Sequence, residues 1–188
     1  MRVIAGEARG RILHGPKSAG TRPTSDLARG AVFSMLESRG ALFTRVLDLF
    51  AGTGALGIEA LSRGADWADF IESDRAACGV IAANLVSTGF QQRAAVVCAA
   101  LPVALMRVWG SYGLIFVDPP YGLDNLSAVW DRLRESGTID PETTIAYEHS
   151  RRTIPPERCG PLPRIVTRAH GTTAVSLYYA GEPNTRDR

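Results

Sequence analysis

One stretch restricts the fold of this chain more than any other. Residues 45–57 read RVLDLFAGTGALG. The part from Val46 to Phe50 is apolar except for Asp48, which is typical of a strand buried within a parallel sheet. Three glycines follow with the spacing G-x-G-x-x-G, and helix-forming residues continue until Gly64. Such glycines let the chain turn sharply and let a ligand approach bare backbone, so the stretch predicts the strand, turn and helix of a nucleotide-binding α/β fold.

Asp48 distinguishes between the ligands that such a turn can bind. The glycine spacing fits a dinucleotide pocket, but it also occurs in unrelated strand–turn–helix units. A carboxylate beside the turn would repel a pyrophosphate, because a charge pair ~4 Å apart at an effective dielectric constant near 20 is worth roughly 4 kcal/mol. A cationic nucleoside such as S-adenosylmethionine would be attracted instead. The alternative is that Asp48 caps a neighbouring loop.

Length and composition are those of one globular domain with a small appendage. The chain has 188 residues, of which 45% are hydrophobic and 21% are charged. Its apolar runs are shorter than the ~20 residues of a membrane helix, and the N-terminus lacks the apolar region of a signal peptide. We therefore expect a cytoplasmic protein with no membrane partner. The three cysteines have no metal-ligand spacing, and no metal is expected.

Basic charge is concentrated at the start of the chain. Residues 1–39 contain seven Lys or Arg and three acids, whereas the remainder contains fourteen basic and sixteen acidic side chains. A basic arm on a mildly acidic body suits a polyanionic partner. We therefore divide the chain into an extension over 1–39, a main domain over 40–180 and a disordered tail over 181–188.

Local patterns within the extension predict a hairpin and a helix. Two strand-like pieces, residues 2–4 and 10–14, flank a short turn. A helix is expected after Thr24 or Ser25, either of which can cap its first N–H groups. Its expected apolar stripe consists of Leu27, Ala28, Ala31, Val32, Met35 and Leu36. Arg22 and Arg29 lie outside this stripe, so they are either solvated surface charges or phosphate contacts.

A second strand, residues 67–72, ends in an acid twenty residues beyond Gly52. In a doubly wound sheet the end of this strand lies beside the first glycine turn, where the carboxylate of Glu72 can accept hydrogen bonds from both ribose hydroxyls. The alternative is a solvated strand end. Ser73 or Asp74 then caps the next helix.

The remaining segments continue the alternation of strands and helices. Strands are expected over 93–98, 113–117 and 143–147, helices over about 102–109 and 123–136, and a closing hairpin of 165–168 with 173–179.

The strand at 113–117 runs directly into Asp118-Pro119-Pro120-Tyr121. Two prolines remove two N–H donors and fix φ, so we expect a rigid loop whose carbonyls point outward without partners. At the carboxyl end of a parallel sheet, this loop offers a carboxylate, carbonyl acceptors and an aromatic face. Those groups suit an amino group on a planar base. The alternative is that the prolines only end the strand and Tyr121 is a core aromatic.

These segments together resemble the RsmD family, bacterial methyltransferases that modify the exocyclic N2 of one guanine in 16S ribosomal RNA. The resemblance runs over about residues 1–180. Its most specific pieces are RVIAG at 2–6 with Gly10-Arg11, RPTSD at 22–26, DLFAGTGALG at 48–57, ESD at 72–74 and DPPY at 118–121. The Arg-Pro-Thr segment separates this family from other amino-methyltransferases with an Asp/Asn-Pro-Pro-Tyr loop.

The resemblance implies a class I S-adenosylmethionine-dependent methyltransferase. Its fold would be a Rossmann-like seven-stranded sheet with the last strand antiparallel, and a small N-terminal hairpin and helix would help to hold RNA. The implied cofactor-binding residues are Asp48, Gly52, Gly54, Glu72, Ser73 and Ala100. The implied catalytic residues are Asp118, Pro119, Pro120 and Tyr121, with Asp118 and Pro119 gripping the amine and Tyr121 stacking on the ring. The implied RNA-binding residues are Arg9, Arg11, Arg22, Thr24 and Arg29.

Two positions depart from the family pattern. Relatives often carry a polar residue near the adenine, where this chain has Ala99-Ala100, so adenine contact would rely on backbone. The usual Arg-Glu pair of the first helix appears as Arg29-Gly30.

The implied partner is 16S rRNA within a 30S subunit or an assembly intermediate, and the implied state is a monomer. Other readings remain open: methylation of another amino group, such as adenine N6 or a protein amide, by the same loop; an NAD-dependent oxidoreductase; and a non-catalytic RNA-binding module.

Overall fold

The computed structural model describes residues 1–15, 26–120, 123 and 126–180. The predictions for Arg22, Thr24, Tyr121 and the tail 181–188 therefore lie outside the described residues.

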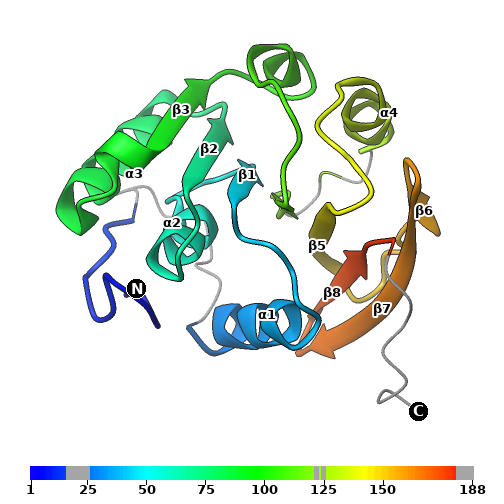
Figure 1. Ribbon diagram of the computed structural model, residues 1–188, viewed down its shortest axis with the longest axis horizontal. Helices are drawn as coiled ribbons and strands as arrows, with labels where there is room; N and C mark the ends of the chain where they lie inside the picture. Colours follow the sequence, from blue (N-terminus) through cyan, green and yellow to red (C-terminus); the bar gives the residue numbers. More distant parts are fainter. Residues whose placement is uncertain (16–25, 121–122, 124–125, 181–188) are drawn as a thin grey trace.

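One mixed sheet forms the centre of the molecule, with the strand order β3-β2-β1-β4-β5-β8-β7-β6 (Figure 1). Strands β1 to β5 are mutually parallel, β8 is antiparallel to β5, and β7 is antiparallel to β8. The strands are β1 (Arg45–Leu49), β2 (Trp67–Glu72), β3 (Ala94–Cys98), β4 (Leu114–Val117), β5 (Thr144–Ser150), β6 (Arg158–Cys159), β7 (Leu162–His170) and β8 (Thr173–Tyr178). The seven longer strands confirm the predicted sheet, including its antiparallel last strand, and the two-residue β6 extends its edge.

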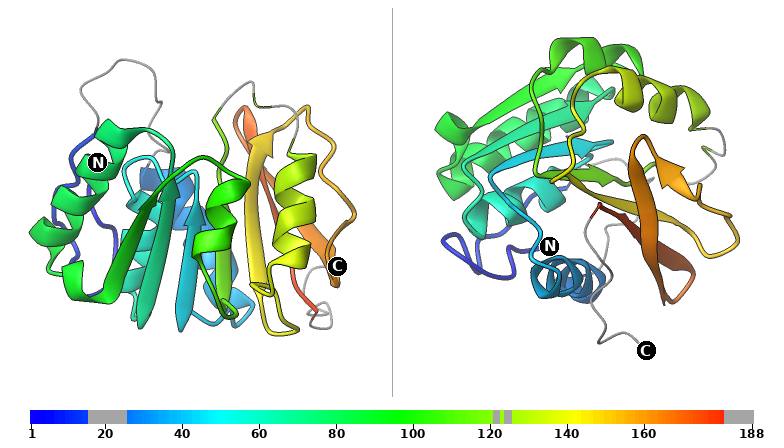
Figure 2. Two further views of the ribbon diagram at one scale, coloured as in Figure 1. Left: turned by 90° about the horizontal axis from the view of Figure 1, so that it is seen from above. Right: turned by 45° about the vertical axis from the view of Figure 1, so that its right-hand side comes forward.

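Helices cover both faces of the sheet (Figure 2). The helices are α1 (Asp26–Ser38), α2 (Ala55–Ser62), α3 (Arg75–Thr88) and α4 (Ser127–Glu135), with the 3-10 turns η1 (Gln91–Arg93) and η2 (Val103–Arg107). One apolar core joins α1, α2 and α3 to the face carrying Phe70 and Phe116. A second core joins η2 and α4 to the face carrying Leu47 and Ile115. The segment expected as a helix over 102–109 is thus a short 3-10 turn.

The predicted stripe of α1 is wrong at its start. Leu27 is 87% exposed, while the buried face consists of Arg29, Val32, Phe33 and Leu36. These four positions have the i, i+3, i+4, i+7 spacing of one helix face. A prediction based only on apolar residues therefore leaves Arg29 out of the buried face.

The N-terminal segment folds as predicted into a small hairpin, which docks on α2 and α3. A bridge joins Arg2 to Ile12, and Val3, Ala8 and Leu13 are buried in the same core as α1 and α2. Backbone donors of the hairpin bond side chains of the helices: Ile4 and Ala5 to the Glu59 carboxylate at 2.8 and 3.0 Å, Ala8 to Ser62 Oγ at 2.9 Å, and His14 to Asn84 Oδ1 at 2.9 Å.

A matched pair of glycines tests this docking. Gly6 and Gly10 both have positive φ, +79° and +84°, but only Gly6 lies against α2: a Cβ there would be 1.7 Å from the Ser62 carbonyl oxygen, whereas one at Gly10 meets nothing within 4 Å. Both alanine variants carry the backbone strain, and only Gly6→Ala adds the clash. We expect Gly6→Ala to be less stable than Gly10→Ala by about 1–3 kcal/mol in urea unfolding. Equal stabilities would contradict this docking.

Within the described ranges, no helix is both long and apolar enough to span a bilayer.

Candidate active site

Three acidic side chains lie at or near the carboxyl ends of neighbouring parallel strands. Asp48 is on β1, Glu72 ends β2, and Asp118 directly follows β4. Strands β2 and β4 pair with the two sides of β1, where chain order reverses across the sheet. Ligands of open α/β sheets bind at such a switch point. The fold therefore brings the two sequence motifs together at one edge.

The glycine turn between β1 and α2 is held by Glu72. Gly52 and Gly54 have φ of +56° and +75°, which favours glycine at both positions. The Gly52 N–H donates to Glu72 Oε2 at 2.8 Å, and Glu72 Oε1 accepts from the Asp74 N–H at 2.8 Å. The predicted proximity of Glu72 to the first turn is confirmed.

Asp48 is buried directly beneath this turn. Its side chain is 1% exposed, and its Oδ2 accepts a hydrogen bond from the Gly57 N–H, in the first turn of α2, at 2.9 Å. Burial raises the pKa of Asp48 well above its ordinary value, the Gly57 bond lowers it, and the charges of Asp118 and Glu72 raise it further. The ionised form of this buried carboxylate is destabilised by the loss of water and by the neighbouring negative charges. A cation bound nearby would stabilise the ionised form.

Gly57 is needed because Phe70 lies against it. A Cβ at this position would be 2.4 Å from the Phe70 ring and 3.2 Å from Asp48 Oδ2. The third glycine of the motif thus lets α2 pack closely on the sheet, which is the packing role that glycine has in such turns.

The proline loop differs in one respect from its prediction. Asp118 and Pro119 are half-buried and Pro120 is exposed. The Pro120 carbonyl is not left without a partner, because it accepts from the Leu123 N–H at 3.2 Å.

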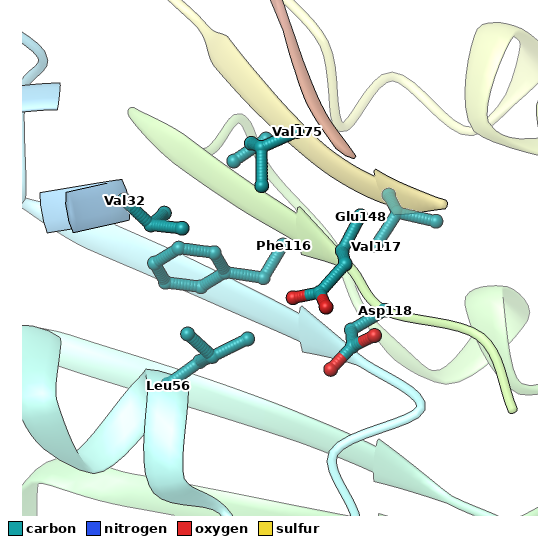
Figure 3. Close-up of a pocket in the computed structure, with 8 residues that line it drawn as sticks. Val32, Leu56, Phe116, Val117, Asp118, Glu148 and Val175 are labelled. Carbon is teal, nitrogen blue, oxygen red and sulfur yellow. The ribbon is translucent and has the colours of Figure 1, made fainter. Parts of the chain in front are cut away.

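Glu148 is an acidic residue that the sequence reasoning did not identify. It is on β5, half-buried, and it lines a small pocket together with Asp118 (Figure 3). Burial raises its pKa, and a hydrogen bond with the Thr173 side chain lowers it. A signal existed, because the expected strand ended at Tyr147 and Glu148 comes directly after it, as Asp118 comes after β4.

Ser73 and Ala100 lie at the outer edge of the same region. Both are exposed. Ser73 Oγ donates to Glu72 Oε1 at 3.4 Å, and the Ala100 carbonyl accepts from the Ala104 N–H at 3.0 Å. The Ala99 N–H bonds the Glu72 carbonyl at 2.9 Å. These positions border the space next to Glu72.

The predicted RNA-binding arginines separate into two groups. Arg9 and Arg11 are exposed on the hairpin. The prediction for Arg29 is wrong, because its side chain is fully buried on α1. Its guanidinium bonds the Arg2 carbonyl and Asp26, and its Nε lies 3.9 Å from Glu59 Oε2. Arg29 therefore ties the hairpin to α1 and α2 rather than facing a phosphate.

The described part of the chain contains no group of three or more His, Cys, Asp or Glu that could hold a metal ion. The acids at the sheet edge suit a ligand with a cationic group and hydroxyls. Asp48 could hold the cationic portion, and Glu72, beside Gly52, could accept from a ribose.

Comparison with known proteins shows close relatives over nearly the whole chain. The family model described as "Conserved hypothetical protein 95" matches residues 1–179. The chain is 37% identical over 184 residues to a Bacillus subtilis protein named putative rRNA methyltransferase YlbH, covering 95% of this chain and 98% of the relative. It is 38% identical over 148 residues to ribosomal RNA small subunit methyltransferase D of Escherichia coli K12, covering 79% and 74%.

A solved structure agrees with these matches. The structure described as putative methyltransferase yhhF from Escherichia coli has a TM-score of 0.81 at 33% identity, covering 96% of this chain and 99% of that one. The fold, the two motifs at one sheet edge and the length of these matches lead to one assignment. The chain belongs to the RsmD family, the family whose model carries the description "Conserved hypothetical protein 95".

Proposed function

We propose that this protein transfers a methyl group from S-adenosylmethionine to the exocyclic N2 of a guanine in small-subunit ribosomal RNA. The observation that carries the proposal is the position of Asp118. It follows the strand that pairs with β1, close enough to Asp48 for its charge to raise the pKa of that buried acid. An acceptor for an amine thus lies beside a site for a cation. The names of two relatives refer to rRNA methylation.

The residues that would contact the cofactor and the amine have the following roles in this reaction. When bound, the cofactor supplies a methyl group on a sulfonium, which needs no further activation. Glu72 accepts from the ribose, and Asp48 with Gly52 and Gly54 lines the methionine side. Asp118 and the Pro119 carbonyl accept from the amine and aim its lone pair at the methyl group, so catalysis is largely positioning. As the N–C bond forms and the S–C bond breaks, the amine loses a proton, which the Asp118 carboxylate would accept.

The RNA side of the proposal rests on the hairpin. Arg9 and Arg11 present two guanidinium groups to solvent, and guanidinium forks suit phosphate. Residues 1–39, including Arg22 and Thr24, would hold the RNA, and 40–180 would carry the chemistry. The target guanine must leave its stack, at a cost of a few kcal/mol, and loop or single-stranded RNA lowers that cost. We place the reaction in the cytoplasm, with a monomer acting on a 30S subunit or its assembly intermediate.

The rival readings fit the site less well. A nicotinamide dinucleotide would bring its pyrophosphate next to a turn that has Asp48 beneath it and Glu72 bonded to Gly52. A non-catalytic RNA-binding module would have no use for the acceptor loop. Methylation of adenine N6 or a protein amide uses the same chemistry, so only the identity of the methylated product distinguishes these reactions from methylation of guanine N2.

The deciding experiment maps methylated nucleosides. We expect rRNA from a strain lacking this gene to lose one N2-methylguanosine from the small subunit, and purified protein with S-adenosylmethionine to restore it. An unchanged N2-methylguanosine pattern, or restoration of a different methylated base, would overturn the proposed reaction.

A further inference from the structure

We propose that Glu148 selects guanine by accepting a hydrogen bond from its N1–H while Asp118 holds the neighbouring N2 amine. The inference rests on the function proposed above and adds the residue that recognises the base.

Strand register places the two carboxylates side by side. In the pairing of β4 with β5, Phe116 lies opposite Ala146 and Val117 opposite Tyr147. Asp118 and Glu148 occupy the next step, on strands that lie about 4.8 Å apart. Paired residues of parallel strands point to the same face. Figure 3 shows both carboxylates directed into one space, with the ring of Phe116 to one side of them.

Apart from the two acids, the side chains that line this pocket are apolar, so the acids supply the side-chain hydrogen bonds that recognise a ligand. Its other lining residues are Val32, Leu56, Phe116, Val117, Ala146 and Val175. None of the described lining residues is basic. Apolar walls also strengthen hydrogen bonds to the acids by excluding water. The pocket therefore suits a ligand edge that brings two adjacent donors.

Among the bases that carry an amino group, guanine has such an edge. Its N1–H lies next to its N2 amine, so both groups donate in the same direction. Adenine instead presents an N1 lone pair beside its N6 amine, and cytosine presents an N3 lone pair beside its N4 amine. Either lone pair would face the Glu148 carboxylate and be repelled. A site built on hydrogen bonds rejects a base that cannot supply them far more strongly than an apolar pocket does.

The test compares two bases that share the N2 amine and differ at N1 and at C6. The guanine that the wild-type protein methylates is mapped first. RNA carrying either guanine or 2,6-diaminopurine at that position is then assembled by ligation. 2,6-Diaminopurine keeps the N2 amine but has a lone pair at N1. The wild type should prefer guanine by about 100-fold in kcat/KM. Glu148→Gln has an amide that can donate to that lone pair, so its preference should fall at least tenfold while S-adenosylmethionine affinity stays unchanged.

The control variant is Glu142→Gln, which changes an exposed glutamate in the turn just before β5. It should keep the wild-type preference. If wild type and Glu148→Gln both make N2-methylguanosine with the same preference, base selection by Glu148 is wrong and the proposed function stands. If the wild type methylates no guanine N2, both proposals fail together.

Discussion

Replacing Asp118 with alanine should reduce methyl transfer by at least about 1,000-fold while S-adenosylmethionine affinity stays nearly unchanged. The residue follows β4 and lines the pocket that also contains Glu148. In the proposed reaction it is the main acceptor for the target amine. Without it the amine is no longer aimed at the methyl group, and small errors in such an alignment cost large factors in rate. The loss should appear in kcat measured by methyl incorporation at saturating RNA.

Asp118→Asn provides the graded comparison. Its amide oxygen still accepts one hydrogen bond from the amine, but the neutral side chain cannot take the proton. We expect activity between those of wild type and Asp118→Ala. Calorimetry with S-adenosylmethionine should give all three proteins similar affinities, which separates chemistry from binding. Full turnover by Asp118→Ala would remove the role assigned to this residue.

Local motifs made the cofactor side of the site predictable. A strand, a glycine turn and a helix are consecutive in sequence, so the spacing of Gly52 and Gly54 translates directly into backbone conformation. The position of Glu72 was predictable for a related reason: parallel strands of one sheet end at the same edge, and its bond to the Gly52 N–H follows from that geometry.

Features that depend on tertiary packing were harder to predict. Arg29 has the right spacing for the buried face of α1, but a charged residue is almost never buried without partners. Asp26 is a local partner, but Glu59 and the Arg2 carbonyl lie on other segments, so the sequence around Arg29 does not reveal them. Glu148 directly follows a strand expected from the sequence, but its position beside Asp118 depends on the register of β5 on β4, which the local sequence does not reveal.

Replacing Asp48 with asparagine should weaken S-adenosylmethionine binding and stabilise the ligand-free protein. Burial raises the pKa of Asp48 in the folded state above its value in the unfolded chain. The folded state therefore holds the proton more tightly, and the contribution of Asp48 to stability falls as pH rises from the unfolded pKa towards the folded one. At pH values above the unfolded pKa, Asp48 therefore lowers the stability of the folded state. Asparagine keeps an oxygen to accept from the Gly57 N–H and removes the charge.

The Asp48→Asn variant should thus be more stable than wild type by on the order of 1 kcal/mol at neutral pH. The difference should shrink as pH falls to about 4, where Asp48 gains its proton in both states. Thermal unfolding across this pH range measures the effect. Because acids far from Asp48 titrate alike in both proteins, the difference between them reports on Asp48 together with its two charged neighbours, Asp118 and Glu72. A variant less stable than wild type at neutral pH would show that the buried charge is already compensated.

Ligand binding should change in the opposite direction. A charge pair ~4 Å apart is worth roughly 4 kcal/mol, and the variant loses this pair. The amide dipole offsets part of the loss. We therefore expect S-adenosylmethionine to bind about 100-fold more weakly in calorimetry. 5′-Methylthioadenosine lacks the sulfonium and the amino-acid portion, so its affinity should be unchanged. Equal losses for both ligands would mean that asparagine had disturbed the turn itself, whereas no loss for either would place the cation away from Asp48. The expected combination, a more stable protein that binds its cofactor less well, arises because this buried charge is costly until a cation lies beside it.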